Sequence, residues 1–285
     1  MRFAKYEGAG NDFVMLLDLE DVQPVGAEEA AALCDRRFGV GADGTIRVVR
    51  RGDAFFMDYR NADGSQAEMC GNGVRCVAAF VRDVGVTGAE HLDIVARSGS
   101  RSVEAREDGR FTVHMGVPRF PKSTVPMRGP AWETFLYQPL DLGGGLTVKA
   151  SALSMGNPHL VLFVEEDPVR YHVGHIGPAL EHDERFPEGV NVEFARIRDG
   201  DRIDARVWER GSGETLACGS GACAVAVAAN EAGLIARRAV VRFPGGDLEV
   251  ERRDDGEILL TGGATRVFEG SIDLERLSAF AELQR

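Results

Sequence analysis

The chain has 285 residues, 44% of them hydrophobic, so it is long enough to bury either one large core or two ordinary ones. Its formal net charge is −12 and it has no cluster of Lys or Arg, which argues against a nucleic-acid or anionic-membrane partner and favours a small molecule. It has neither a bilayer-length apolar run nor a signal-peptide segment, so we expect a cytoplasmic protein whose five cysteines stay reduced.

The first half of the chain reads as strands with two helices. Residues 2–17 predict a strand pair broken by a glycine turn, and residues 27–36 have the apolar spacing of a helix. Residues 73–83 predict a second helix, apolar on most faces and ended by Gly85. The remaining strands of this half are expected at 44–50, 54–60, 91–96, 102–105 and 111–115.

The second half repeats this series of elements. Its helix, residues 221–232, is apolar all round and built from small residues, so it belongs at the centre of a domain, surrounded by sheet. Its strands are expected at 150–153, 160–163, 191–197, 203–209, 240–243, 248–251 and 258–260.

The two halves also share short phrases in the same order. Cys70-Gly71-Asn72-Gly73 recurs as Cys218-Gly219-Ser220-Gly221, and Gly10-Asn11 recurs as Gly156-Asn157. We interpret the halves as two copies of one α+β domain, with an active site in the cleft between them. The expected domains are residues 1–118 and 119–265, joined through the Pro- and Gly-rich stretch 118–130. The tail 266–285 is a candidate to pack on the first domain.

Cys70 and Cys218 each lie between a loop and the start of an expected buried helix. The first amide groups of a helix have no internal partner and carry partial positive charge, so we expect both thiols to be acidified and a carboxylate to bind beside them. Two such thiols suit proton removal from one face of an α-carbon and proton return to the other face. Cys34, Cys76 and Cys223 fall within helical patterns and are interpreted as buried apolar residues.

Several phrases resemble those of the diaminopimelate epimerase family over residues 2 to 263. They are Gly10-Asn11-Asp12-Phe13, Asn61-Ala62-Asp63-Gly64-Ser65, Met69-Cys70-Gly71-Asn72-Gly73, Gly156-Asn157-Pro158-His159, Glu209-Arg210-Gly211-Ser212-Gly213 and Ala217-Cys218-Gly219-Ser220-Gly221. The resemblance implies two domains, each a barrel-like mixed sheet around a central helix. It also implies interconversion of LL- and meso-2,6-diaminopimelate without pyridoxal phosphate or metal, a step towards lysine and peptidoglycan, and it is consistent with a homodimer.

Carried over position by position, the resemblance assigns Cys70 and Cys218 as the catalytic thiols. It assigns His159 and Glu209 as aids to proton transfer. The positions that match substrate-binding residues are Asn11, Asn61, Gly71, Asn72, Asn157, Asn191, Glu209, Arg210, Gly219 and Ser220. A substrate with two amino-acid ends needs partners for two carboxylates and two ammonium groups, which such residues can provide.

One departure and two alternatives qualify this interpretation. Gly44 stands where the family often has Gln, so a side-chain contact near the substrate is missing. The nearest alternative is a racemase of the same fold that acts on proline, hydroxyproline or histidine. A thiol switch or a zinc site is a different class of function, but the spacings Cys70-x5-Cys76 and Cys218-x4-Cys223 fit a zinc knuckle poorly.

Overall fold

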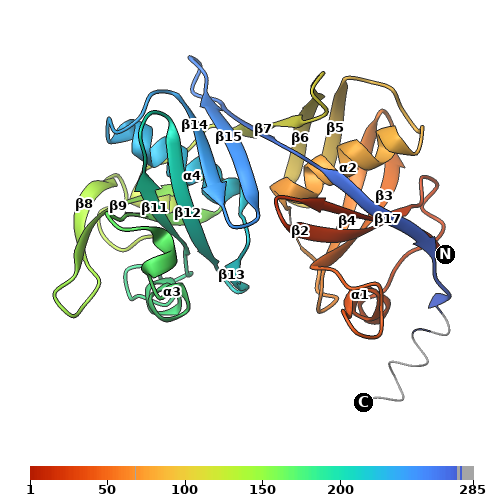
Figure 1. The fold of residues 1–285 in the computed structure, drawn as a ribbon, viewed down its shortest axis with the longest axis horizontal. Helices are drawn as coiled ribbons and strands as arrows, with labels where there is room; N and C mark the ends of the chain where they lie inside the picture. Colours follow the sequence, from red (N-terminus) through yellow and green to blue (C-terminus); the bar gives the residue numbers. More distant parts are fainter. Residues whose placement is uncertain (68, 275–276, 278–285) are drawn as a thin grey trace. The chain divides into compact units, whose positions relative to one another are not determined.

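The computed structural model describes the chain except residues 68, 275–276 and 278–285, and the chain folds as two compact units (Figure 1). Unit 1 comprises Met1–Val113 and Gly262–Arg285, and unit 2 comprises His114–Thr261. Both divisions fall a few residues before the expected domain boundaries at 118 and 265. In the described residues each unit combines a mixed sheet with two α-helices, which makes the chain an α+β protein.

Unit 1 is built around helix α2 (Gly71–Asp83). Its other helix, α1 (Ala27–Cys34), packs Ala30 and Leu33 into a cluster with Val14. The strands of this unit, in chain order, are β1 (Arg2–Gly8), β2 (Asn11–Leu17), β3 (Gly44–Arg51), β4 (Ala54–Asn61), β5 (His91–Ala96), β6 (Gly99–Ala105), β7 (Phe111–Gly116), at which the chain leaves the unit, and β17 (Thr265–Ser271).

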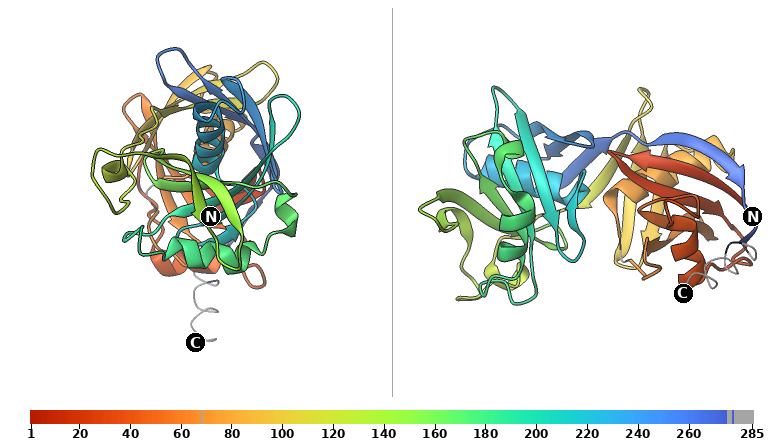
Figure 2. Two further views of the ribbon diagram at one scale, coloured as in Figure 1. Left: turned by 90° about the vertical axis from the view of Figure 1, so that its left-hand side faces the viewer. Right: turned by 60° about the horizontal axis from the view of Figure 1, so that its bottom comes forward.

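Unit 2 is built around helix α4 (Gly219–Glu231), which the left panel of Figure 2 shows enclosed by strands. Its other helices are α3 (Val173–Glu181) and two short 3₁₀ turns, η1 (Lys122–Thr124) and η2 (Pro168–Arg170). Its strands are β8 (Phe135–Asp141), β9 (Thr147–Ser154), β10 (Pro158–Phe163), β11 (Asn191–Ile197), β12 (Arg202–Glu209), β13 (Gly213–Thr215), β14 (Arg238–Phe243), β15 (Gly246–Arg252) and β16 (Ile258–Gly262).

The strand pairings of the two units follow one pattern. In unit 1, β1–β2 is antiparallel, β2–β3 parallel, β3–β4 antiparallel, β4–β5 parallel and β5–β6 antiparallel. In unit 2, the corresponding pairs β9–β10, β10–β11, β11–β12, β12–β14 and β14–β15 have the same directions. The duplication seen in the short phrases therefore extends to the topology.

The strand that pairs with the outer edge of the first hairpin comes from a different part of the chain in each unit. In unit 2, β8 precedes β9 in the chain and pairs with it, whereas in unit 1 the partner of β1 is β17, close to the C-terminus. The start of the tail thus pairs with unit 1, and Ile272 donates its N–H to the Met1 carbonyl oxygen. The part of the expected tail at 275–276 and 278–285 lies outside the described residues.

The two glycine-led helices are the buried centres that their composition predicts. Every residue from Gly71 to Val81 is buried in α2, and every residue from Gly219 to Ala229 in α4. Both begin two residues earlier than the expected 73–83 and 221–232. The apolar periodicity used to predict a helix does not detect glycine, because glycine has no side chain, so the predicted helix begins two residues late. The hydrogen-bonded helix itself begins directly after each cysteine.

Besides the two 3₁₀ turns, one helix and three strands were not expected, namely α3, β8, β13 and β17. The sequence of α3 holds two glycines and a proline, and β17 is largely exposed, so neither has a strong apolar period. The stretch 118–130, expected as a connector, instead belongs to unit 2, where Val125 and Met127 join a buried apolar cluster. Among the described residues, the helices lack the length and hydropathy needed to span a bilayer.

Candidate functional site

Cys70 is the N-cap of α2 in unit 1. Its backbone is extended, with φ −141° and ψ 120°, and the helix starts at Gly71. The Cys70 thiol donates to Asn11 Oδ1 at 3.3 Å, although Asn11 opens β2, far from Cys70 in the sequence. The fold thus brings together Cys70, Gly71 and Asn11, all of them expected site residues.

Asn11 is held in turn by a group of charged side chains. Asn11 Nδ2 donates to Asp43 Oδ2 at 2.8 Å, which leaves Oδ1 turned towards the thiol. The Arg36 guanidinium contacts both Asp43 and Asp12, and Lys5 Nζ lies 2.8 Å from Asp12 Oδ2. Burial by itself would raise the pKa of Asp12, but hydrogen bonds from Arg36 and Lys5 outweigh it and hold that pKa at about 2.

Replacing Asp12 by Asn is expected to remove a pH-dependent part of the free energy of unfolding. The folded pKa of about 2 lies below the usual value near 3.9, so the stabilisation is complete well above pH 4 and is lost as the pH falls towards 2. Because Arg36 is 56% exposed, solvent screening reduces the effect to about 1 to 2 kcal/mol at neutral pH.

Urea unfolding of the wild type and Asp12→Asn between pH 2.5 and 7 measures this difference. The two stabilities should converge as the pH falls. Asp53→Asn, which changes an exposed carboxylate in a turn of the same unit, serves as the control and should run parallel to the wild type. A constant gap between Asp12→Asn and the wild type over the whole range would contradict the assigned role.

The other expected side chains of unit 1 are Asn72, in the first turn of α2, and Asn61, at the end of β4. Asn72 is 2% exposed, and its Oδ1 accepts from Arg75 Nη2 at 2.8 Å. Asn61 ends β4, and its Nδ2 donates to Ser65 Oγ at 3.0 Å. The side chain of Asn72 is therefore engaged inside the unit, whereas Asn61 lies at a strand end, next to Gly44 in the β3–β4 pairing.

Gly44 occupies a position with no room for a side chain. A Cβ there would lie 2.4 Å from a ring carbon of Tyr59 and 2.6 Å from the Arg60 carbonyl oxygen. Gly44 pairs with Phe13 of β2 as Asn191 pairs with His159 in unit 2. The Tyr59 ring thus fills the space that a larger side chain at position 44 would need, so this position of Tyr59 requires glycine at position 44.

Cys218 is the N-cap of α4 in unit 2 and is 6% exposed. Its Sγ accepts from the Gly221 N–H at 3.4 Å and lies 3.4 Å from Ser220 Oγ. A Cβ added to Gly221 would lie 2.9 Å from Glu193 Oε1 and 3.1 Å from Cys218 Cβ. Glycine is therefore required here so that the helix can pass close to both groups.

The expectation of an acidified thiol is wrong for Cys218. Burial raises its pKa well above the usual value, and the negative charges of Glu209 and Glu193 raise it further. Hydrogen bonds from Ser220 and the Gly221 N–H oppose this but do not outweigh it. Loss of hydration disfavours a thiolate more strongly than the first turn of a helix favours it, which composition alone does not reveal.

His159 and Asn157 continue from Ser220 into the interior of unit 2. Asn157 Nδ2 donates to Ser220 Oγ at 3.3 Å, and Asn157 Oδ1 lies 3.0 Å from His159 Nε2. His159 Nδ1 lies 2.6 Å from Glu193 Oε1, and both side chains are completely buried. Glu193 was missed from the sequence, although a carboxyl group inside the otherwise apolar strand Val192 to Ala195 was an available signal.

Asn191, Glu209 and Arg210 lie together at strand ends of the same unit. Asn191 Nδ2 donates to the Pro158 carbonyl oxygen at 2.7 Å, and its Oδ1 accepts from the Arg210 N–H at 2.9 Å. Thr215 Oγ1 donates to Glu209. Arg210 is exposed, and its Nη1 donates to the Glu188 carbonyl oxygen at 3.0 Å. The described contacts thus tie Asn191 to the backbone of Arg210.

The remaining three cysteines are buried inside their units. Burial raises the pKa of Cys34 to about 11, and it also raises the pKa of Cys76. Cys223 is buried within α4. None of the five cysteines, all of which lie in the described part of the chain, forms a disulfide.

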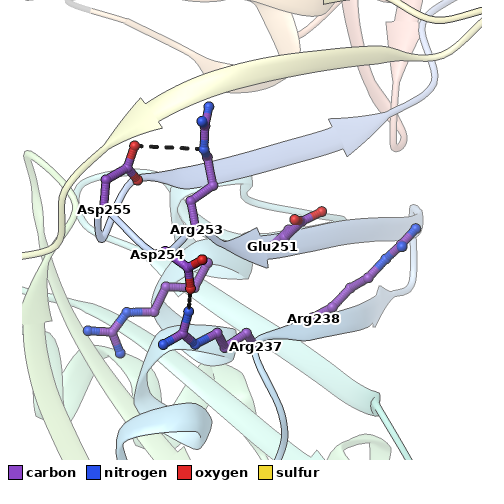
Figure 3. Close-up of a pocket in the computed structure, with 7 residues that line it drawn as sticks. Arg237, Arg238, Glu251, Arg253, Asp254 and Asp255 are labelled. Carbon is purple, nitrogen blue, oxygen red and sulfur yellow. Dashed lines mark hydrogen bonds and ion pairs between the residues drawn. The ribbon is translucent and has the colours of Figure 1, made fainter.

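A surface pocket of unit 2, shown in Figure 3, is unrelated to the cysteines. It is lined by Arg237, Arg238, Glu251, Arg252, Arg253, Asp254 and Asp255. Arg252 Nη1 donates to Glu231 Oε1 at 2.6 Å, which places the pocket at the C-terminal end of α4. A helix of 13 residues is about 20 Å long, so the pocket is remote from Cys218.

Comparison with known proteins shows extended similarity in sequence. The family model described as diaminopimelate epimerase matches residues 3–121 and 151–267. A diaminopimelate epimerase of Acidiphilium cryptum is 44% identical over 277 residues, which cover 97% of this chain and 98% of the relative. A chloroplastic diaminopimelate epimerase of Oryza sativa subsp. japonica is 44% identical over 282 residues, which cover 95% of this chain and 80% of the relative.

Solved structures share the architecture at much lower identity. A hydroxyproline epimerase from Agrobacterium vitis superposes with a TM-score of 0.62 at 11% identity, covering 95% of this chain and 91% of that chain. Identity this low shows a common fold alone.

Proposed function

The chain belongs to the diaminopimelate epimerase family and is an isomerase, and on this basis we propose that it interconverts LL- and meso-2,6-diaminopimelate with Cys70 and Cys218 as its two proton-transfer groups. The observation that carries the proposal is the matched placement of the two thiols. Each is the N-cap of a buried, glycine-led helix in one of two units with the same strand pairings. Inversion at one carbon needs an acid and a base of this kind on opposite faces.

The helix starts supply the groups that hold the reacting end of the substrate. In this proposal the backbone N–H groups at Gly71 and Asn72, and at Gly219 and Ser220, bind the α-carboxylate and stabilise the negative charge that develops on proton removal. All four residues lie in the first turn of their helices, where backbone N–H groups point out of the helix start and can bind an anion.

The distal end of the substrate carries a second carboxylate and a second ammonium group. We assign Arg210 to the carboxylate, because a guanidinium binds carboxylates through two parallel hydrogen bonds. Glu209 is assigned to an ammonium group and, together with His159, to assistance of proton transfer. Amide side chains can donate to carboxylates and accept from ammonium groups, a role we assign to Asn11, Asn61, Asn157 and Asn191.

We propose that the reaction needs no pyridoxal phosphate, because the three lysines are committed elsewhere. Lys5 Nζ bonds Asp12 and the Gly41 carbonyl oxygen, and Lys122 pairs with Glu133 at 2.7 Å. Lys149 lies over the Tyr137 ring. A Schiff base would therefore require one of these to give up its contacts.

Two further proposals concern the protein in the cell. We propose a cytoplasmic location, because five cysteines that form no disulfide suit a reducing compartment. We also propose a homodimer, which rests on the family resemblance and is tested by light scattering of the purified protein.

Deuterium uptake from heavy water tests the proposed substrate. The purified protein should exchange the α-hydrogen of LL- and meso-diaminopimelate and interconvert them, and it should leave proline, hydroxyproline and histidine unlabelled. Exchange into one of the latter with none into diaminopimelate would assign the chain to another specificity. The assay should also proceed in protein dialysed against a chelator and free of added pyridoxal phosphate.

A further inference from the structure

A buried acid and a buried histidine lie beneath Cys218. Glu193 and His159 are both completely buried and meet at 2.6 Å between Oε1 and Nδ1. They come from the adjacent parallel strands β11 and β10. From His159 a continuous series of contacts runs through Asn157 and Ser220 to the Cys218 sulfur.

The contacts of His159 define which ring nitrogen carries a proton. Nε2 faces Asn157 Oδ1, which can only accept a hydrogen bond, so Nε2 must be protonated. Nδ1 and Glu193 Oε1 then share one proton, held either by the carboxyl group or by the ring. In both cases Glu193 secures the Nε2–H form of the ring, as a partner on one nitrogen commonly does for the other.

The protonation of Nε2 gives the whole series one direction. His159 Nε2–H donates to Asn157 Oδ1, and Asn157 Nδ2–H donates to Ser220 Oγ. The Ser220 hydroxyl is then able to donate to Cys218 Sγ, 3.4 Å away, beside the Gly221 N–H. Aligned hydrogen bonds polarise one another, so all donors favour negative charge on the sulfur.

The equivalent place in unit 1 contains no such pair. There Phe13 takes the position of His159 in the strand pairing. Ile46 takes the position of Glu193: a Cβ on Gly73 would meet Ile46 Cδ1 at 3.0 Å, whereas a Cβ on the equivalent Gly221 would meet Glu193 Oε1. The Cys70 thiol donates to Asn11 Oδ1. The acid–histidine pair is therefore particular to the unit that contains Cys218.

The surroundings of Glu193 favour a protonated carboxyl group. Its Oε2 is buried and has no hydrogen-bond partner in the described part of the chain, an arrangement that is far less costly for a neutral acid than for a carboxylate. Burial raises the pKa of Glu193, and the negative charge of nearby Glu209 raises it further. The charge of His159 lowers this pKa but does not outweigh burial.

We propose that Glu193 is a positioning residue for Cys218: it holds His159 with its proton on Nε2 and so directs the donors of Asn157 and Ser220 towards the sulfur, which allows a buried thiol to become a thiolate. The proposal rests on the proposed function only in taking Cys218 as a proton-transfer group.

The tautomer of His159 is the first test and needs no substrate. Nitrogen-15 NMR of histidine-labelled protein, with the signal assigned by loss in His159→Asn, should show His159 protonated on Nε2 in the wild type. Glu193→Gln should keep this form, because the amide can donate to Nδ1. Glu193→Leu leaves only Asn157 to select the tautomer, so it should populate the Nδ1–H form in part. Ser151→Ala removes a buried hydroxyl that accepts from the Tyr137 N–H outside the series, and it should match the wild type.

The pH profile of kcat/KM is the second test. In the reaction direction for which Cys218 is the base, Glu193→Leu should move the acidic limb of the profile to higher pH by about one unit. On that limb the fraction of Cys218 present as thiolate would then be about tenfold smaller at a given pH. Glu193→Gln and Ser151→Ala should keep the wild-type limb.

Two results would overturn the proposal. The first is a wild-type His159 that is protonated on Nδ1 alone, a result that does not depend on any variant being folded. The second is a folded Glu193→Leu protein that has the wild-type His159 tautomer and the wild-type acidic limb of the kcat/KM profile. Absence of diaminopimelate turnover in the wild type would refute the proposed function and leave the NMR result intact. If the wild type turns over diaminopimelate normally, the second result would refute the role of Glu193 alone.

Discussion

Cys70→Ser and Cys218→Ser are each expected to abolish measurable steady-state epimerisation, which requires kcat to fall by at least about 10²- to 10⁴-fold. A hydroxyl group is far less acidic than a thiol, so serine cannot act as the base that removes an α-hydrogen. Each thiol serves one face of the carbon, and the loss of either interrupts inversion. The measurement is the initial rate of conversion between the LL and meso isomers.

The two serine variants should also divide the half-reactions between them. A variant that keeps one thiol can still remove and return a proton on that face, so it should exchange deuterium into one isomer without inverting it. The complementary variant should label the other isomer. This pattern would assign each thiol to its stereoisomer, and full turnover in either variant would refute the two-thiol mechanism.

Cys34→Ser is the matched control for these variants. Cys34 is buried in unit 1, and its Sγ lies 3.3 Å from Thr45 Oγ1, a contact that a serine hydroxyl can keep. Burial holds the pKa of Cys34 at about 11, so the residue stays protonated near neutral pH. Epimerisation by Cys34→Ser should equal that of the wild type within about twofold.

Gly221→Ala is expected to lower kcat by about 10²-fold while the protein remains folded. The new methyl group would lie 2.9 Å from Glu193 Oε1, 3.1 Å from Cys218 Cβ and 3.4 Å from Cys218 Sγ. At least one of these groups must move, and small displacements of a reacting group are costly. Alanine is the better helix former by about 1 kcal/mol, which offsets part of the crowding in stability.

Gly73→Ala is the control from the other unit. Its methyl group would meet a terminal methyl of Ile46 at 3.0 Å and Cys70 Cβ only at 3.6 Å, so a rotation of Ile46 relieves most of the crowding. We expect less than a tenfold loss of kcat. Thermal unfolding of both variants separates displacement of the thiol from loss of fold, and equal kcat values for Gly221→Ala and the wild type would contradict the close packing around Cys218.

The sequence predicts the parts of this protein that repeat. The two glycine-led phrases and the apolar runs behind them located α2, α4 and their N-cap cysteines, because helix burial and strand alternation are local properties of neighbouring residues. The repeated order of elements likewise predicted the strands up to β16 except β8 and β13, with differences of up to three residues at their ends. Weakly patterned elements such as α3 and β17 escaped notice, because their places depend on the strands and helices they pack against.

For the candidate site, too, the sequence determined some features and the tertiary structure determined the others. Composition and motif determined by themselves that two thiols begin two buried helices, and the family resemblance named the polar residues expected near them. Only the tertiary structure decided that burial raises the pKa of Cys218, that Tyr59 takes the space beside Gly44, and that Glu193 supports His159. Hydration, close approach and hydrogen-bond partners are set by residues distant in the chain, which no local pattern contains.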